Sequence, residues 1–378
     1  MRIAFLTTSP DWTGSARAFA MAARAFATAG DDVRFLVPPD SRVQEHLARE
    51  PYVVEPVDLG GWWLSRALRL SRVLSHHRSD VVFLHTASEH IAVALSAPIR
   101  GKRGVVRRVP AGGRAELGWS TKLACRLARS AFLFASEKEA REALVPAELG
   151  PSFAATPGIE SADEAPTTQS EDAVEAAATD SYHIICIYDG ISRGRTALPV
   201  RTVALMAPRH PEIRLSIVGP GSDAEEIRMH VAALDVLTRV DLLGERDDLQ
   251  QLMRGATLGW IACRGDDAAF AILDLMAEGL PVVAPDDGIC ERYVADGITG
   301  MVVRGEDAAL AAGILAGVLG NARQIAAMSH AARVRLAREF PETRMLAGFD
   351  AAATAVRSGG IRVQTEYTRA QPGAADTA

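Results

Sequence analysis

Carboxylates concentrate in the segment 258–284. Asp266 and Asp267 follow an apolar run typical of a buried strand, and Asp274 stands one turn inside the apolar stretch that comes next. We expect a strand, an acidic loop, a helix that begins near Ala269, and a further strand. The free N–H groups of such a helix favour an anion such as a diphosphate, and the carboxylates can accept hydrogen bonds from sugar and ribose hydroxyls.

A purely structural interpretation of these residues is equally open. Asp266 or Asp267 then caps the helix, and Asp274 faces solvent. Two further strand-to-helix turns carry glycines, Gly14 after the first strand and Gly219 in a later turn. A glycine in such a turn lets a ligand approach the backbone, although Gly14 serves equally well as a loop residue beside a capping serine.

The turns described above follow predicted strands, so the sheets that contain those strands position them. The chain alternates short apolar runs with segments of helical periodicity almost from end to end. The runs that we interpret as strands are 2–8, 33–38, 81–85, 104–109, 131–135, 183–188, 214–218, 240–243, 258–261 and 281–284. Because β-branched runs between helices indicate strands buried on both faces, they predict parallel sheets.

A polar stretch separates two such series, and the alternation restarts at His183. We therefore expect an α/β protein of two doubly wound, Rossmann-like domains facing a cleft. The expected divisions are an N-terminal domain 1–160, an acidic linker 161–180, a C-terminal domain 181–358 that ends in a helix, and a disordered tail 359–378.

The composition narrows the classes of function. With 378 residues, 48% of them hydrophobic and 23% charged, the chain suits two globular domains, and its apolar runs are too short to span a bilayer. The N-terminus lacks the pattern of a signal peptide, so we expect a cytoplasmic protein. The four cysteines are scattered and the nine histidines form no ligand pair, so neither a metal site nor a cofactor is expected.

Charge is unevenly distributed along the chain. Residues 1–160 carry 21 Lys and Arg against 16 Asp and Glu, whereas the remainder carries 20 against 31. The basic half favours an anionic partner. Nucleic acid is not the expected partner, because aromatic residues make up only 6% of the chain and form no stripe with basic ones.

The order of seven motifs resembles the retaining glycosyltransferases of family 4, which have the GT-B fold. That family carries Glu-x7-Glu followed by Ala-Met-Ala-x-Gly-x-Pro-Val-Val, and here Asp266-x7-Asp274 precedes Leu-Met-Ala-Glu-Gly-Leu-Pro-Val-Val. The six other motifs lie in register within residues 1–358, at 80–85 (DVVFLH), 156–160 (TPGIE), 193–194 (RG), 218–221 (VGPG), 240–244 (VDLLG) and 296–300 (DGITG).

The chain also departs from the family pattern. Both family glutamates are aspartates, so each carboxylate reaches about 1.5 Å less far. Gly190 is followed by isoleucine where the family has a phosphate-binding arginine, and Asp267 and Ala269 replace glycines. Arg107 and Arg108 stand where the family often has a histidine. Fold and donor binding tolerate such changes better than catalytic rate does.

The resemblance implies transfer of a sugar from a nucleoside-diphosphate sugar to a glycan or lipid-linked acceptor, with retention of configuration. The implied site comprises Asp266 and His85 as catalytic residues, Gly14, Arg193, Arg195, Gly219, Ala269, Phe270, Ala271 and Asp274 as donor-binding residues, and Arg107 and Arg108 on the acceptor side. The alternatives are that His85 is a core or rim histidine and that the two arginines are solvated rim charges.

Other functions stay open. A degenerate relative would bind a nucleotide sugar or a partner without turnover, and a nucleotide-sugar epimerase would need acid–base residues that the sequence does not identify. Trp62-Trp63, followed by arginines within 66–78, also suggests a helix that contacts anionic lipid at the inner membrane face. An ordinary surface helix is the alternative for that segment.

Overall fold

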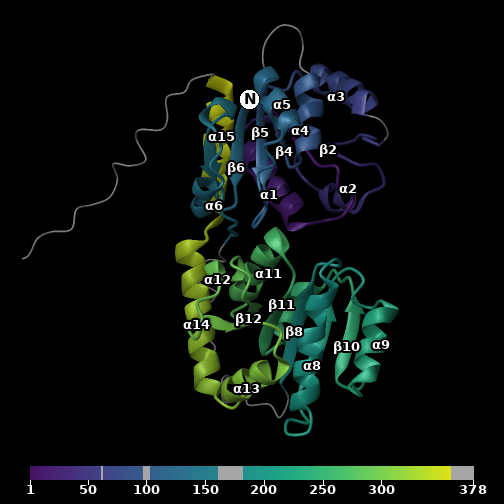
Figure 1. The fold of residues 1–378 in the computed structure, drawn as a ribbon, viewed down its shortest axis with the longest axis vertical. Coiled ribbons are helices and arrows are strands. Elements are labelled where there is room, and N and C mark those ends of the chain that lie inside the picture. The colour runs from purple at the N-terminus through teal and green to yellow at the C-terminus, as the bar shows by residue number, and fades with distance from the viewer. Residues whose placement is uncertain (61–62, 97–102, 161–181, 359–378) are drawn as a thin grey trace, which may run out of the picture. The chain divides into compact units, whose positions relative to one another are not determined.

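The computed structural model describes residues 1–60, 63–96, 103–160 and 182–358. These residues form two compact units (Figure 1). Unit 1 comprises Met1–Trp12, Ala16–Thr156 and the chain from Leu346, and unit 2 comprises Thr13–Ser15 and Pro157–Met345. The expected linker 161–180 and tail 359–378 lie entirely outside the described residues.

Unit 1 contains one parallel sheet of seven strands. In spatial order the strands are β3 (Val53–Pro56), β2 (Asp32–Val37), β1 (Arg2–Leu6), β4 (Val81–Leu84), β5 (Gly104–Val109), β6 (Arg129–Phe134) and β7 (Ser152–Ala154). The helices between them are α1 (Gly14–Thr28), α2 (Arg42–Leu47), α3 (Trp63–His77), α4 (Ala87–Leu95), α5 (Trp119–Leu127), α6 (Glu137–Glu142) and the 3-10 turn η1 (Ala147–Leu149). Every residue of β4 is buried, as its apolar run predicts, and every residue of β5 is buried as well.

The two faces of this sheet have different cores because successive strand residues point to opposite sides. Ala4 and Leu6 of β1 pack with the apolar residues of α3 and α4. Phe5, between them, stacks on Phe83 of β4 with ring centroids 4.8 Å apart and meets Phe19 of α1 at 5.3 Å. An aliphatic core therefore supports one helical layer, and an aromatic core supports the other.

The helix α15 (Glu342–Ser358) completes the aromatic core of unit 1 from the far end of the chain. The Phe349 ring lies 5.5 Å from that of Phe83. Gly348 lets the helix approach closely, because a Cβ at this position would lie 2.1 Å from the carbonyl oxygen of Ala154. Only a glycine fits against β7 in this way.

Unit 2 contains a parallel sheet of six strands. Their spatial order is β10 (Val240–Gly244), β9 (Arg214–Val218), β8 (His183–Tyr188), β11 (Leu258–Ala262), β12 (Val282–Pro285) and β13 (Gly300–Val303). The helices are η2 (Arg193–Thr196), α8 (Ala197–Met206), α9 (Glu225–Ala233), α10 (Leu249–Arg254), α11 (Gly265–Ala277), α12 (Cys290–Tyr293), α13 (Ala308–Leu319) and α14 (Ala322–Glu339). The predicted fold class of two doubly wound α/β domains is confirmed.

The alternation of β11 residues shows how α8 and α11 cover opposite faces of this sheet. Trp260 belongs to the core that includes α8 and α13. Gly259, beside it, faces α11 so closely that a Cβ there would lie 2.4 Å from a methyl group of Leu275. The reversal of strand order between β8 and β11 brings the starts of η2 and α11 to the carboxyl edge of the sheet, where α/β proteins bind ligands.

No single helix among the described residues is long and apolar enough to cross a membrane. The pair α13 and α14 meets the length and composition criteria only when taken together, and the pair bends by 97°.

Candidate functional site

Asp189 organises the carboxyl edge of the unit 2 sheet. It directly follows β8, and its carboxylate accepts hydrogen bonds from the N–H of Ile191 at 3.0 Å and of Ser192 at 2.7 Å. Its second oxygen accepts from the hydroxyl of Ser192 at 2.7 Å and from the N–H of Arg264 at 3.0 Å. One carboxylate therefore ties the loop before α8 to the residue before α11.

Arg195 connects the ends of two strands in the same region. One terminal nitrogen of its guanidinium donates to the carbonyl oxygen of Cys263 at 2.7 Å, just beyond β11. The other lies 2.8 Å from Oδ2 of Asp287, just beyond β12. The predicted phosphate-binding arginine is thus already held by protein groups, and a bound phosphate would have to share its remaining donors.

These contacts keep the Asp287 carboxyl group ionised. Burial opposes its ionisation, but hydrogen bonds from the N–H of Cys290 and from Arg195 outweigh burial and hold its pKa below the usual range. The ion pair with Arg195 is therefore present at neutral pH. Neither Asp287 nor Asp189 was identified from the sequence, although Asp189 is the first residue after β8 and Asp287 the second after β12, at the strand ends where such folds carry their sites.

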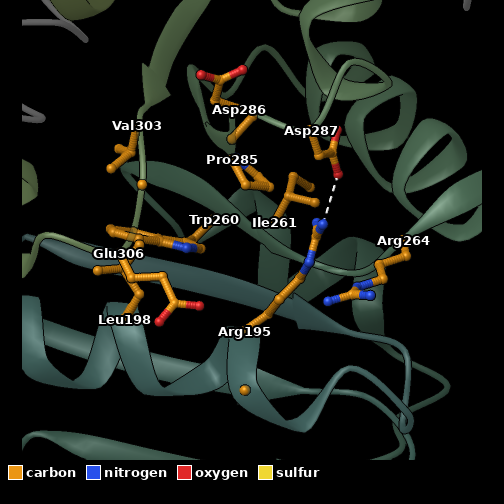
Figure 2. Close-up of a pocket in the computed structure, with 13 residues that line it drawn as sticks. Arg195, Leu198, Trp260, Ile261, Arg264, Pro285, Asp286, Asp287, Val303 and Glu306 are labelled. Atoms are coloured by element: carbon orange, nitrogen blue, oxygen red, sulfur yellow. Dashed lines mark ion pairs between the residues drawn. The ribbon is translucent and has the colours of Figure 1, made fainter.

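A pocket of about 200 Å³ opens beside this ion pair (Figure 2). Figure 2 shows the Trp260 ring between Val303 and Leu198, with Arg195 reaching up to Asp287 and Arg264 on the other side of Arg195. The lining residues are Gly194, Arg195, Leu198, Trp260, Ile261, Arg264, Ala284, Pro285, Asp286, Asp287, Val303, Gly305 and Glu306. Among the predicted site residues whose side chains the structure describes, only Arg195 lines this pocket.

The helix α11 begins earlier than predicted. It starts at Gly265 rather than near Ala269, and Gly265 takes a φ of +59°, a conformation that favours glycine. The N–H of Ala268 already bonds to the carbonyl oxygen of Arg264 at 3.2 Å. The amides of Ala269, Phe270 and Ala271 therefore lie inside the helix, and the N–H groups without an intrahelical partner belong to Gly265 and the two residues after it.

This change moves the carboxylates as well. Asp266 lies in the first turn of α11 rather than on a loop, and it is buried, while Asp274 lies partly buried on the same helix. A rigid helix fixes their separation at about 12 Å along its axis. The expectation that Asp266 lies on an acidic loop before the helix is therefore wrong.

Asp267 has an unusually high pKa for an aspartate. Burial raises its pKa to about 6, and the charges of Asp266 and Asp189 act in the same direction. At neutral pH the start of α11 thus carries several carboxylates, which partly offset the positive end of the helix dipole. Arg264, at the N-cap position, makes no side-chain capping hydrogen bond and adds a cation there.

Gly219 has a structural role in the turn after β9. Its φ is +136°, and a Cβ would lie 1.9 Å from the carbonyl oxygen of Tyr188. Its N–H donates to the carbonyl oxygen of Gly244 at 2.9 Å. The close backbone approach that this glycine permits in the structure is to the end of β8.

In unit 1, Glu89 joins the ends of β1 and β4. This buried carboxylate accepts from the N–H and hydroxyl of Thr8 at 2.9 and 2.7 Å, and from the N–H groups of His85 and Thr86 at 2.9 and 2.8 Å. The His85 ring stacks on Phe19, with centroids 3.8 Å apart and planes 17° from parallel. His85 is therefore packed against the aromatic core while its backbone is held at the strand end.

Arg107 and Arg108 are not the solvated rim charges that the sequence analysis allowed. Both are buried within β5. Arg107 donates to the carbonyl oxygen of Glu116 and to the hydroxyl of Thr121, each at 3.1 Å, and burial lowers its pKa. Consecutive residues of a strand point to opposite faces, so the two guanidinium groups cannot clamp one anion together.

The remaining predicted residues lie at element starts. Gly14 is the first residue of α1, and Arg193 is the first residue of η2. The Arg193 side chain is not among those that the structure describes. Within the described ranges, no group of three or more His, Cys, Asp or Glu side chains could hold a metal ion.

Residues 195–319 match the family model described as Glycosyl transferases group 1. The chain is 25% identical over 286 residues to the GDP-mannose-dependent alpha-(1-6)-phosphatidylinositol monomannoside mannosyltransferase of Mycolicibacterium smegmatis, covering 71% of this chain and 74% of that protein. It is 32% identical over 138 residues to the phosphatidyl-myo-inositol mannosyltransferase of the same organism, covering 35% of this chain and 34% of that protein.

Solved structures with a similar fold include a glycosyltransferase from Rickettsia africae and Anabaena Alr3699/HepE in complex with UDP. The first has a TM-score of 0.74 at 14% identity, covering 95% of this chain and 99% of that one. The second has a TM-score of 0.72 at 18% identity, covering 94% and 100%. The chain thus has the GT-B fold, and the sequence likenesses support a nucleotide-sugar-dependent glycosyltransferase of group 1 type.

Proposed function

We propose that this protein transfers a hexose from a nucleoside-diphosphate sugar to a lipid-linked or glycan acceptor, with retention of configuration. In this reaction the bond between the anomeric carbon and the diphosphate breaks, and a bond to an acceptor hydroxyl forms on the same face of the sugar. The diphosphate leaves with the bonding electrons, so negative charge grows on it. A catalyst must stabilise that charge.

The observation that carries the proposal is the start of α11. Its N–H groups lie at the carboxyl edge of the sheet, and Arg264 rather than an accepting side chain occupies the N-cap position. Arg195, tied to Asp287, lies in the same pocket lining as Arg264. Peptide dipoles and guanidinium groups fixed in this way stabilise a departing diphosphate with little reorganisation, and this chemistry does not require a metal.

The carboxylates of α11 supply the remaining roles in the proposal. Asp274 accepts hydrogen bonds from the donor's ribose, and Asp266 contacts the transferred sugar. Arg193, at the start of η2, neutralises phosphate charge. The fixed helical spacing of Asp266 and Asp274 supports this assignment, because a ribose and a hexose bridged by a diphosphate are also held well apart.

The acceptor assignment rests on the relatives. Two of the similar proteins are named for phosphatidylinositol mannosides or phosphatidyl-myo-inositol as acceptors, and one for GDP-mannose as donor. We therefore propose an acceptor with a lipid anchor and a polyol head group. His85, at the end of β4, is assigned to the acceptor side of the reaction.

A non-catalytic nucleotide-sugar binder is the second candidate, and Asp267 favours it. An added carboxylate at the start of α11 opposes the charge that grows on a leaving diphosphate. Its pKa of about 6 means that it is mostly ionised at pH 7.5. This candidate keeps donor binding and loses transfer.

The test has two stages. Calorimetric titration with GDP, UDP, ADP and their hexose conjugates should find one nucleotide series that binds. Transfer of radiolabelled hexose from the best-binding donor to an extract of polar lipids should then give a labelled lipid. If a bound donor is neither transferred nor hydrolysed, the non-catalytic candidate is correct, and if no nucleotide binds, both are wrong.

A further inference from the structure

The helix α5 exposes apolar and basic side chains on one face. Trp119 is 79% exposed, Leu123 37% and Leu127 38%. These residues are four apart, so they form a stripe along one side of the helix. Lys122 and Arg126, both exposed, form a second stripe beside the first. We call these five residues the α5 face.

The opposite side of α5 accounts for its place in the fold. Thr121 and Ala124 are completely buried, and Ala124 belongs to the aliphatic core of unit 1. The helix is therefore anchored without the α5 face. Exposing a tryptophan and two leucines contributes nothing to that anchoring, whereas it suits a surface that contacts another apolar phase.

The neighbouring helices α3 and α4 also expose apolar side chains. α4 packs against α5 and α3 packs against α4, and the three form one layer (Figure 1). Leu68 of α3 is 63% exposed, and Leu95 at the end of α4 is 42% exposed. The three helices contain a single acidic residue, Glu89, and it is buried. The layer therefore presents basic groups to solvent without acidic ones from its own helices.

Two acidic groups near the layer pair with arginines of unit 1. Asp58 lies 2.7 Å from a terminal nitrogen of Arg69 on α3. Glu116, just before α5, lies 3.5 Å from the Arg107 guanidinium. Arg69, one of the arginines within 66–78, thus has a protein partner, and Trp62 lies outside the described residues. Lys122 and Arg126 keep the α5 face positively charged.

We propose that the α5 face docks this protein on an anionic lipid surface. Tryptophan and leucine enter the boundary between head groups and acyl chains, and flanking Lys and Arg side chains bind the lipid phosphates. Each basic side chain near such a surface strengthens binding about fivefold. This surface is independent of the donor pocket in unit 2 and of the proposed transfer activity.

The experiment is sedimentation of the full chain, without substrate, with vesicles of phosphatidylcholine alone or mixed with phosphatidylglycerol. Binding should require the anionic lipid. The double variant Lys122→Gln with Arg126→Gln should bind about 30-fold less strongly, as two basic contacts imply. The variant Leu123→Gln with Leu127→Gln should also lose binding, because its apolar stripe cannot enter the boundary.

Matched controls use exposed residues of unit 2. Arg209→Gln with Arg323→Gln removes two exposed charges, and Met229→Gln with Leu237→Gln removes two exposed apolar side chains. Both controls should bind vesicles like the unaltered protein. Trp119→Phe should keep binding but remove most of the vesicle-induced blue shift in tryptophan emission, which would locate the contact at α5.

Two outcomes would overturn the proposal. One is equal vesicle binding by the α5 variants and the controls, with unfolding transitions showing that all are folded. The other is a protein that does not bind anionic vesicles but forms an oligomer by light scattering, and whose oligomer dissociates when Leu123 and Leu127 are changed. In that case the α5 face contacts a second copy of the chain instead.

Discussion

The guanidinium of Arg195 bridges two strand ends by contacting Asp287 at 2.8 Å and the carbonyl oxygen of Cys263 at 2.7 Å. Asp287→Asn should destabilise unit 2 by about 1–3 kcal/mol at pH 7, because a largely buried guanidinium loses its charged partner. The folded-state pKa of Asp287 is lowered, so this contribution is present above the ordinary pKa of 3.8 and is lost as the pH falls through the lower folded-state value. Denaturant titrations at pH 7 and pH 3 measure the difference.

A control for that ion pair exists on the surface of the same unit. Arg246 lies 2.7 Å from Asp248, and neither side chain is buried. Asp248→Asn should leave the unfolding free energy unchanged, since solvent screens exposed pairs. Equal losses in the two variants would mean that burial of the Arg195 pair does not matter.

Asp267 should make both stability and donor binding depend on pH. Its pKa of about 6 lies above the ordinary 3.8, so its protonated form favours the fold. The stabilising effect is full below the ordinary pKa and is lost as the pH rises through 6. Asp267→Asn should therefore raise the free energy of unfolding at pH 7.5 by at most about 3 kcal/mol, with a corresponding rise in Tm. At pH 4 it should change either quantity little.

The same carboxylate should weaken binding of an anionic donor once it ionises. We expect the affinity for the best nucleotide sugar to fall about tenfold between pH 5 and pH 7.5, because one like charge is added near the diphosphate. Asp267→Asn should flatten this profile, whereas Asp241→Asn, at an exposed strand position, should not. A nucleotide sugar is the better probe because its diphosphate has no ionisation in this range.

Gly219 and Gly221 provide a test of structural necessity. Both have a positive φ, but only at Gly219 would a Cβ meet the backbone, 1.9 Å from the Tyr188 oxygen. Gly219→Ala should cost more than about 3 kcal/mol of stability, and Gly221→Ala about 1–2 kcal/mol for the left-handed conformation alone. Urea denaturation checks this order, and similar losses would show that the Gly219 turn can relax.

Asp266 and Asp274 should separate turnover from binding. Asp274→Ala should weaken donor affinity about ten- to a hundredfold, through the loss of charge-assisted hydrogen bonds to the ribose. Asp266→Ala should lower kcat more than affinity. Titration and initial-rate measurements on both variants decide the roles. If both bind donor and turn it over like the unaltered protein, the carboxylates of α11 have no part in the site.

Chelation provides a further check on the chemistry. The proposed stabilisation of the diphosphate uses the start of α11 and arginine side chains, so EDTA should leave the transfer rate unchanged. An activity that is lost with EDTA and restored by a divalent cation would show that a metal carries part of that charge.

The strands of both sheets were predictable where burial is complete. The runs at β4, β8 and β11 are almost wholly apolar on both faces, which is typical of a covered parallel sheet. β3 and β7 were missed because they are short, partly exposed edge strands without such runs. β13 was also missed: it is only four residues long and was not among the runs that we interpreted as strands.

The site was less predictable because side-chain partners decide it. α11 begins at Gly265, which has a positive φ. The sequence analysis instead placed the acidic residues on a loop and began the helix near Ala269. Arg107 and Arg108 resemble surface charges in sequence, yet Arg107 is buried because Glu116 and Thr121 satisfy it. Asp189 also accepts a hydrogen bond from the N–H of Arg264, 75 positions away, and no local pattern reveals that contact.

The position of α15 affects the order in which the units can form during synthesis. Domains that emerge first from the ribosome usually fold first. Here Phe349, which packs on Phe83, is made only after the whole of Pro157–Met345. Unit 2 can therefore finish folding while unit 1 still exposes part of its aromatic core, so the half of the protein that is translated first must wait longest for protection.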